Sequence, residues 1–172
     1  MASIPYYTSQ RLKLLKEAAD KWVQDTGIKW DVAAMWNIPN GHIQGSIDHV
    51  EIEIGKRLRR YFNLLDRGIY KARSKSGHRV QRFITIEHAH SVGWHVHGIL
   101  ATPLHVAHQD FIDITKTTWL QCLANNRVGM PQSNLAWCDT IKNRYPQYTT
   151  KQSFGSQHTA RGTIDLMNTS FN

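Results

Sequence analysis

The sequence predicts an α+β protein with a central, mostly antiparallel sheet of about five strands flanked by helices. Apolar residues recur at helical spacing in some segments and alternate with polar residues in the segments between them. Near the middle of the chain, two strand-like segments at 78–88 and 93–102 are joined by a short connection, which predicts a β-hairpin. Strands and helices arranged around a hairpin indicate a layered fold with the sheet at its centre.

The first half of the chain is predicted to contain two helices and one strand. Residues 8–26 form an amphipathic helix that Gly27 ends. Its apolar stripe consists of Leu12, Leu15, Ala18 and Trp22. Residues 28–38 follow as a strand closed by the turn PNGH. A second helix runs from the N-cap Ser46 to about residue 71. Its stripe consists of Val50, Ile54, Leu58, Tyr61 and Leu65.

The second half contains the hairpin, which follows a loop at 74–77. A helix over 105–124, which includes Phe111, Ile114, Trp119 and Leu120, comes next. Residues 133–143 then read as a further strand, and 145–155 as a short helix with Pro146 in its first turn. The final stretch contains one more strand candidate, GTIDLM.

Composition places the chain in the globular class. It has 172 residues, of which 41% are hydrophobic and 20% are charged, enough for one domain with a sizeable core. We find no apolar signal-peptide core and no run near the roughly 18 apolar residues of a membrane span. Two cysteines, Cys122 and Cys138, are too few for a disulfide framework or a cysteine-based zinc site. We therefore expect a cytoplasmic protein without a membrane partner.

The positive charge is large and concentrated. Lys and Arg total 21 against 13 Asp and Glu, which gives a net charge of +8 and a pI near 9.7. Ten of these basic residues lie between Lys56 and Arg82, where Asp66 is the one acid. A solvated helix face followed by a basic loop would also have this composition. A polyanion such as nucleic acid is the partner that the pattern favours.

The hairpin contains residues with metal-ligand character. Side chains alternate along a strand, so His95 and His97 share one face while Val96 points away. If position 87 pairs near position 95, Glu87 lies beside His95 on that face. Two imidazoles and a carboxylate suit Mn²⁺ or Mg²⁺ and are able to bind Zn²⁺. The alternative is a pair of structural histidines. His88 and His90 in the connection are either substitute ligands or polar loop residues.

A second candidate constellation lies in the short helix near the end of the chain. A metal held by three side chains keeps positions open for a phosphate oxygen, which then needs a nucleophile. In YTTK, Tyr148 and Lys151 are three residues apart and share a helical face. A free phenol has a pKa of about 10, so a neighbouring ammonium is the expected assistance. Tyr145 is the alternative nucleophile, although an anchoring role suits it better.

Together, HVHG at 95–98, the carboxylate Glu87 on the preceding strand and YTTK at 148–151 resemble the His-hydrophobic-His (HUH) endonucleases. The resemblance is to the small replication initiators (Rep proteins) of rolling-circle viruses, phages and plasmids. The element order also resembles their ferredoxin-like, RRM-like domain over about residues 28–160. It implies a single nuclease domain with a helical extension at 1–27 and a tail at 161–172. The family's first motif is matched only loosely, by AAMWN around Asn37.

The resemblance implies a strand-specific DNA nickase that also joins strands. His95, His97 and Glu87 would hold Mn²⁺ or Mg²⁺, and Tyr148, assisted by Lys151, would form a 5′-phosphotyrosine link and free a 3′-OH. The substrate would be single-stranded or hairpin origin DNA, in the cytoplasm of a prokaryotic host or wherever the replicon is copied. The residues expected to contact DNA are Arg57, Arg60, Lys71, Arg73, Lys75, Arg79 and Asn37.

Other classes remain open. The chain has no phosphate-binding G-x-x-x-x-G-K-[ST] segment, so a separate helicase and a host polymerase are expected partners. A transposase or mobilisation relaxase would use the same chemistry, although one tyrosine and no third histidine in the motif weigh slightly against a relaxase. A non-catalytic DNA-binding module is the rival from another class. A phosphoesterase with paired His-x-Thr/Ser motifs is disfavoured, because a second copy is missing.

Overall fold

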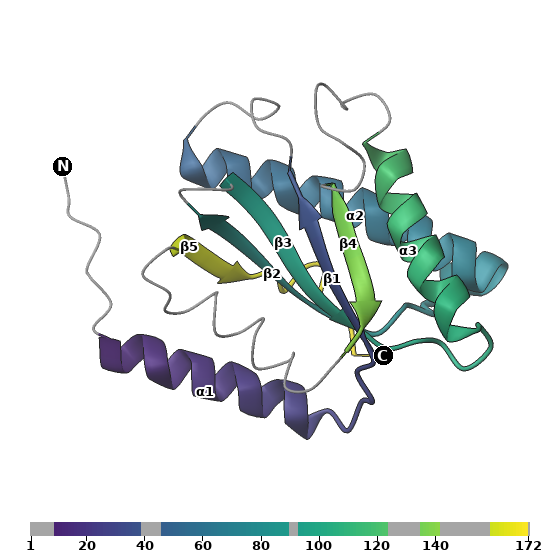
Figure 1. Ribbon diagram of the computed structural model, residues 1–172, viewed down its shortest axis with the longest axis horizontal. Helices are drawn as coiled ribbons and strands as arrows, with labels where there is room; N and C mark the ends of the chain where they lie inside the picture. The colour runs from purple at the N-terminus through teal and green to yellow at the C-terminus, as the bar shows by residue number, and fades with distance from the viewer. Residues whose placement is uncertain (1–8, 39–45, 90–92, 124–134, 142–158, 172) are drawn as a thin grey trace.

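The computed structural model describes residues 9–38, 46–89, 93–123, 135–141 and 159–171. Within these ranges a five-stranded sheet has the order β4-β1-β3-β2-β5, and every neighbouring pair is antiparallel (Figure 1). The strands are β1 (Val32–Asn37), β2 (Arg82–Ala89), β3 (Gly93–Leu100), β4 (Ala136–Thr140) and β5 (Thr159–Ile164). The α+β prediction with a central antiparallel sheet is confirmed. The core order β4-β1-β3-β2 is that of the split β-α-β, ferredoxin-like arrangement.

The helices lie on both sides of this sheet. They are α1 (Ser9–Asp25), α2 (Ile47–Tyr70), the 3₁₀ helix η1 (Lys71–Ser76) and α3 (His108–Cys122). Helices α2 and α3 pack on one face, whereas α1 lies across the other face near one end of the strands (Figure 1). In the described part of the chain, none of the helices combines the length and apolarity needed to cross a membrane.

The core between α2 and the sheet is built around Trp36. Its ring is fully buried and meets Tyr61 and Phe62 edge-on, at centroid distances of 5.4 and 5.8 Å. The predicted α2 stripe is buried throughout, which confirms the helical periodicity. Ser46 caps this helix as expected, because its side chain accepts a hydrogen bond from the His49 N–H at 3.3 Å.

The predicted stripe of the first helix is wrong in its phase. Ala19 and Val23 are buried, whereas Ala18 is exposed and Trp22 keeps 38% of its surface exposed. Val23 packs with Phe83 and Ile99 of the sheet, so the face that turns inward starts one residue later. Trp22 instead contacts Phe83 and Phe171 edge-on from the rim. The side chains of Leu12 and Leu15 lie outside the described residues.

Two strands begin later than predicted because a backbone N–H before each of them donates to a side chain and not to a neighbouring strand. The strand expected from residue 28 starts at Val32, since the Ile28 N–H donates to Thr26 Oγ1 at 3.2 Å in a turn. The strand expected from residue 78 starts at Arg82, since the Val80 N–H donates to Asp66 Oδ1 at 2.9 Å. The expected loop at 74–77 falls largely within η1.

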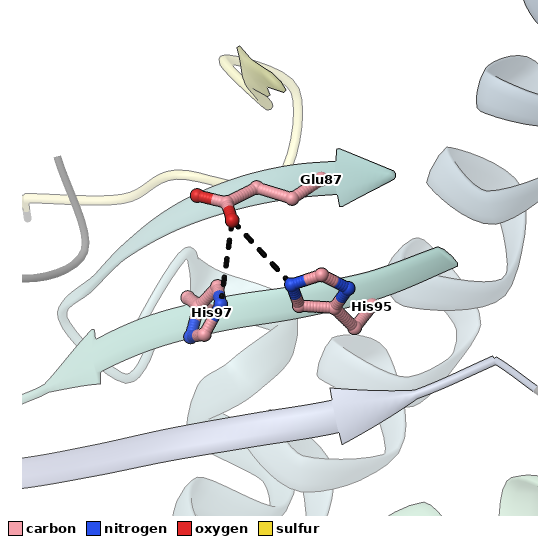
Figure 2. Close-up of side chains that lie close together, drawn as sticks. All are labelled: Glu87, His95 and His97. Atoms are coloured by element: carbon pink, nitrogen blue, oxygen red, sulfur yellow. Dashed lines mark ion pairs between the residues drawn. The ribbon is translucent and has the colours of Figure 1, made fainter. Parts of the chain in front are cut away.

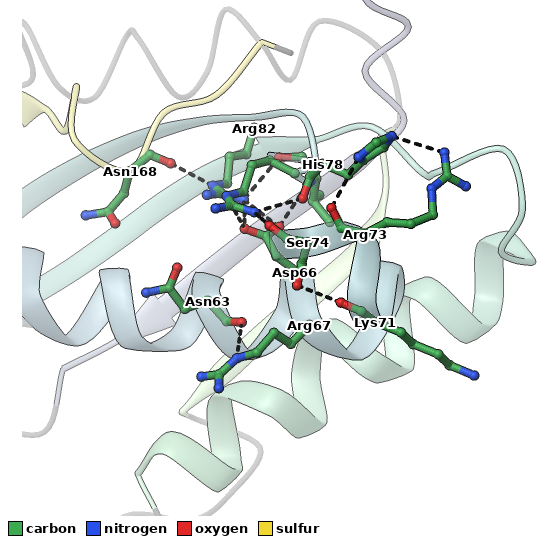
Figure 3. Close-up of polar contacts among 11 residues, drawn as sticks. Asn63, Asp66, Arg67, Lys71, Arg73, Ser74, His78, Arg82 and Asn168 are labelled. Carbon is green, nitrogen blue, oxygen red and sulfur yellow. Dashed lines mark hydrogen bonds and ion pairs between the residues drawn. The ribbon is translucent and has the colours of Figure 1, made fainter. Parts of the chain in front are cut away.

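Asp66 joins α2 to the beginning of β2, and its partner Arg82 also contacts Asn168 near the C-terminus. This buried carboxylate accepts a hydrogen bond from Arg82 Nη1 at 2.9 Å (Figure 3). It also lies 3.5 Å from Arg79 Nε. The Arg82 guanidinium stacks over Phe62 at 4.3 Å and donates to the Asn168 carbonyl at 2.7 Å. These contacts fix the position of β2 against the helix layer.

The C-terminal residues contribute to the sheet. Strand β5 overlaps the first half of the expected GTIDLM segment (162–167), starts earlier, at Thr159, and pairs with β2. Beyond it, Ser170 exchanges backbone hydrogen bonds with Arg82, and Phe171 packs beside Trp22 and Trp30. The predicted division into an extension, a core and a tail stays a prediction. The short helix expected at 145–155 lies outside the described residues.

Gly98 follows the two histidines and lies on the helix-facing side of β3. A Cβ atom at this position would come within 2.7 Å of the Trp36 ring and 3.0 Å of Ile84 Cδ1. Both neighbours are fully buried, so neither has space to move away. Glycine in HVHG therefore allows the central tryptophan to cross over the strand.

Replacing Gly98 by alanine should destabilise the protein by about 1–3 kcal/mol through overpacking against Trp36. Thermal unfolding should show a lower Tm, by roughly 2–4 °C for each kcal/mol in a chain of this size. The matched control is Gly68→Ala on the exposed side of α2, where a Cβ would meet nothing within 4 Å. That change should raise stability by about 0.5–1 kcal/mol. Equal effects of the two substitutions would contradict the packing argument.

Candidate metal centre

The β2–β3 hairpin places Glu87 opposite His95 and Thr85 opposite His97. The predicted site assumed that position 87 pairs near position 95, and the structure has this register. It puts all three candidate ligands on one face of the sheet. The side chains of the opposite face, including Trp94, Val96 and Leu100, pack into the core with α2 and α3. Apolar packing behind the strand therefore determines which way the histidines point.

Both imidazoles converge on a single carboxylate oxygen. Oε2 of Glu87 lies 3.4 Å from His95 Nε2 and 3.6 Å from His97 Nε2 (Figure 2). The three ligand atoms lie within 4.8 Å of one another. Ligands about 2.1 Å from one ion are separated by about 3.0–3.4 Å in octahedral and tetrahedral arrangements. The two nitrogen–oxygen distances are close to what a shared divalent ion requires.

The tautomer of His95 is set by the start of its own strand. The Nδ1 atom of His95 lies 3.1 Å from the Gly93 carbonyl oxygen, which can only accept a hydrogen bond. Nδ1 therefore carries a proton, and Nε2, the nitrogen that faces Glu87, is the atom that can bind either a proton or a metal ion. Metal-binding histidines typically have such a partner on the second nitrogen. The amino-acid sequence does not reveal this contact, because the partner of His95 is a backbone carbonyl.

The centre is removed from solvent. Glu87, His95 and His97 are 1%, 5% and 2% exposed. Burial lowers the pKa of His95, but the hydrogen bonds to Glu87 and Gly93 and the charge of Glu87 together raise it above its ordinary value. A buried carboxylate needs positive charge nearby, which either a protonated imidazole or a divalent cation supplies.

Neighbouring strands add polar groups to the same face. Asn37, at the end of β1, is paired with His95 in the sheet register, so the one predicted DNA contact outside the basic stretch lies beside the centre. Thr85 is fully buried next to His97, and its hydroxyl has no hydrogen-bond partner among the described residues. It is a donor that a group held at the centre can use.

The substitute ligand His88 faces away from the centre. It follows Glu87 directly, so its side chain points to the other side of β2, where its ring lies 4.9 Å from that of Trp94. His90 lies outside the described residues, as do Tyr148, Lys151 and Tyr145. The assignment of nucleophile and helper therefore remains a prediction from the YTTK motif.

The predicted basic contacts lie away from the centre. Arg57 and Arg60 are on α2, on the opposite side of the sheet. Lys71, Arg73 and Lys75 belong to η1, and Arg79 follows it. This segment precedes Arg82 at the start of β2, whereas Glu87 is near the end of that strand. Five strand residues correspond to about 17 Å, so η1 and the centre lie at opposite ends of the sheet.

No protein-family model and no curated protein matches this chain. A solved structure to which it is similar is the N-terminal nuclease domain of non-structural protein 1 from Minute virus of mice. That protein is described as having a unique Zn²⁺ coordination in its active-site pocket and a novel mode of DNA recognition at the origin of replication. The two share 9% identity at a TM-score of 0.38, over 92% of this chain and 79% of that chain. A likeness of this degree assigns neither a family nor an activity.

Replacing Glu87 by glutamine should weaken Mn²⁺ binding by at least about 10–100-fold. Removing a residue that only hydrogen-bonds to a metal ligand already costs this much affinity, and Glu87 is proposed as a ligand itself. Isothermal titration calorimetry with MnCl₂ and ZnCl₂ measures the change, and His97→Ala should behave in the same way. The control is His88→Ala, which removes an imidazole from the same hairpin but from its other face. A loss of affinity in His88→Ala equal to that in Glu87→Gln would contradict the assignment.

Proposed function

We propose that this chain is a metal-dependent endonuclease that nicks and rejoins single-stranded DNA through a covalent tyrosine intermediate. The observation that supports the proposal is the convergence of His95, His97 and Glu87 on one point of the hairpin. The order of this group and the later YTTK motif along the chain supports the same reading. Rolling-circle replication of a virus, phage or plasmid is the process that the motif pair favours.

A divalent cation bound by the three side chains would act as a Lewis acid on a phosphate oxygen and help to orient the scissile phosphate. The protein contributes the preorganisation. Gly93 holds His95 in the ligating tautomer, and the buried face keeps competing water away from Glu87. Asn37 and Thr85 are neighbours of the histidines in the register and would hydrogen-bond the phosphate or the attached sugar.

The nucleophile in this proposal is Tyr148. Its phenolic oxygen forms a bond to phosphorus while the bond from phosphorus to the 3′ oxygen breaks. The phenolic proton is released as the leaving 3′ oxygen becomes a hydroxyl, and the Lys151 ammonium stabilises the negative charge that develops. The downstream strand remains linked through its 5′ phosphate. Attack of a 3′-OH on this link reverses the step and joins strands.

The partners follow from this chemistry. A free 3′-OH primes a polymerase, and continued copying needs strand separation, so we propose a host polymerase and a separate helicase as partners. Mn²⁺ or Mg²⁺ is the proposed native ion, while the histidine pair also suits Zn²⁺. A transposase or relaxase would use the same residues and differ in the DNA that it joins.

One observation favours a second candidate function. Glu87 lies within ion-pair distance of both imidazoles, so the buried group is also consistent with a structural ion pair in a non-catalytic DNA-binding module. The two functions differ in whether a covalent adduct forms and in whether binding to DNA depends on the metal.

An adduct assay tests the proposal directly. Single-stranded and hairpin oligonucleotide pools with randomised loops are labelled at the 3′ end and incubated with the protein and Mn²⁺. We expect an SDS-stable protein band that carries the label, because the downstream fragment keeps its 5′ phosphate on tyrosine. Tyr148→Phe should abolish the band, and Glu87→Gln should reduce its rate of formation by about 100-fold or more.

Tyr145→Phe is the matched control and should leave the band unchanged. An adduct that persists in Tyr148→Phe and is lost in Tyr145→Phe would reassign the nucleophile. Tight binding of the pools with no adduct, with or without Mn²⁺, would favour the DNA-binding module.

A further inference from the structure

A wide groove lies at the end of the sheet opposite the metal centre. Its volume is about 1020 Å³, and its walls come from three connections and the end of α2. These connections precede β1 (26–31), precede β2 (76–81) and follow β3 (101–108). All three meet at this end because β1 and β2 start where the antiparallel β3 stops. The groove therefore lies where the basic η1 segment folds back onto the sheet.

Arginine side chains are held at the wall next to η1. Arg73 Nη2 donates to His78 Nε2 at 3.1 Å, while His78 Nδ1 donates to the Arg73 carbonyl at 3.2 Å (Figure 3). His78, which lines the groove, thus holds the Arg73 guanidinium in place through these two hydrogen bonds. Arg79 shares the single carboxylate of Asp66 with Arg82, so this triad has one uncompensated positive charge. Arg79 is the more exposed of its two arginines, with 35% of its side chain accessible.

The opposite wall adds Lys29, whose side chain is exposed. Among the described residues that line the groove, one is acidic. That residue, Asp31, is already engaged. Its Oδ1 accepts hydrogen bonds from the Thr102 N–H at 2.8 Å and from the Thr102 hydroxyl at 3.0 Å. Its Oδ2 lies 3.6 Å from His108 Nδ1. The remaining electrostatic character of the groove is positive.

Flat rings line the same space. Tyr70 lies between two imidazoles, with centroid distances of 5.9 Å to His78 and 5.2 Å to His105. Both histidines are exposed, so their outer faces are available for stacking. The groove histidines are not a metal cluster, since the described residues contain one group with metal-ligand spacing and it is the hairpin centre. Cations combined with stacking rings are typical of surfaces that bind nucleic acid.

We propose that this groove binds the DNA backbone at a distance from the scissile phosphate. The proposal rests on the proposed function, because it takes the substrate of the metal centre to be DNA. The proposal also gives a role to the basic residues of η1 and the segment after it, which lie away from the metal centre. The two sites are separated by about the length of β3 from His95 to Leu100, roughly 17 Å. At about 3.4 Å per nucleotide, a bound strand would reach the groove about five nucleotides from the nick.

Binding measured without catalysis tests this inference. Fluorescence anisotropy with a 20-nucleotide single strand and a hairpin of equal length is recorded in EDTA, so that neither metal nor cleavage contributes. The test variant is Lys29→Ala with Arg73→Ala, because Lys29 lines the groove, Arg73 is hydrogen-bonded to the groove residue His78, and both are exposed. The control is Lys21→Ala with Lys56→Ala, two exposed lysines on α1 and α2 outside it. Each double variant removes two positive charges.

The groove variant should bind DNA about 10-fold or more weakly at low salt, and the slope of log K against log[salt] should fall by nearly two. The control should change the dissociation constant less than about 2-fold. Thermal melts establish that both variants are folded. Equal weakening in both variants, no weakening in the groove variant, or no DNA binding by the parent protein would each overturn the inference. A larger effect with the hairpin than with the single strand would identify duplex backbone as the bound form.

The outcome is separable from that of the adduct assay. If the groove variant loses binding and no adduct forms with any protein, the groove stands and the nuclease proposal falls. If the parent protein forms the adduct and the groove variant binds DNA normally, the nuclease proposal stands and the groove inference falls.

Discussion

The antiparallel pairing of β2 with β3 is the constraint on which the candidate site depends. The register brings Glu87 opposite His95, and a slip of one residue would turn the carboxylate toward the helices. The register is secured from the other side, where Trp36 crosses Gly98 and the apolar residues of β3 pack against α2. The two faces of β3 therefore have different roles. The apolar face packs against α2 and fixes the register, and the polar face presents His95 and His97 to Glu87.

The same topology explains why the positive charge is displaced from the metal centre. The crossover from β1 to β2 runs through α2, which returns the chain to the opposite end of the sheet before η1 begins. Asp66 of α2 then holds the segment between η1 and β2 in place, because its carboxylate accepts hydrogen bonds from the Val80 N–H and from Arg82. A basic segment adjacent to the hairpin in sequence is thus held about one strand length from the histidines. An extended polyanion is a ligand able to contact both ends.

The hairpin and the α2 core were predictable from the sequence because both depend on local periodicity. Alternation placed the histidines on one face, and helical spacing identified the buried stripe from Val50 to Leu65. The inward phase of α1 was not predictable, since Trp22 and Val23 are both apolar and only the position of Phe83 makes Val23 the inner residue. The Gly93 carbonyl and the late start of β2 depend on backbone contacts, which a pattern of side chains does not encode.

The position of β3 within the sheet also bears on how the molecule can move. This strand has a hydrogen-bonded neighbour on each side, β1 and β2, and β2 is in turn covered by β5. Backbone amides in such a strand open last, often only when the whole domain unfolds, so slow hydrogen exchange is the expected behaviour beneath both histidines. The imidazoles stand on a rigid template, and any motion needed to admit or release a bulky ligand has to come from the segments around the sheet.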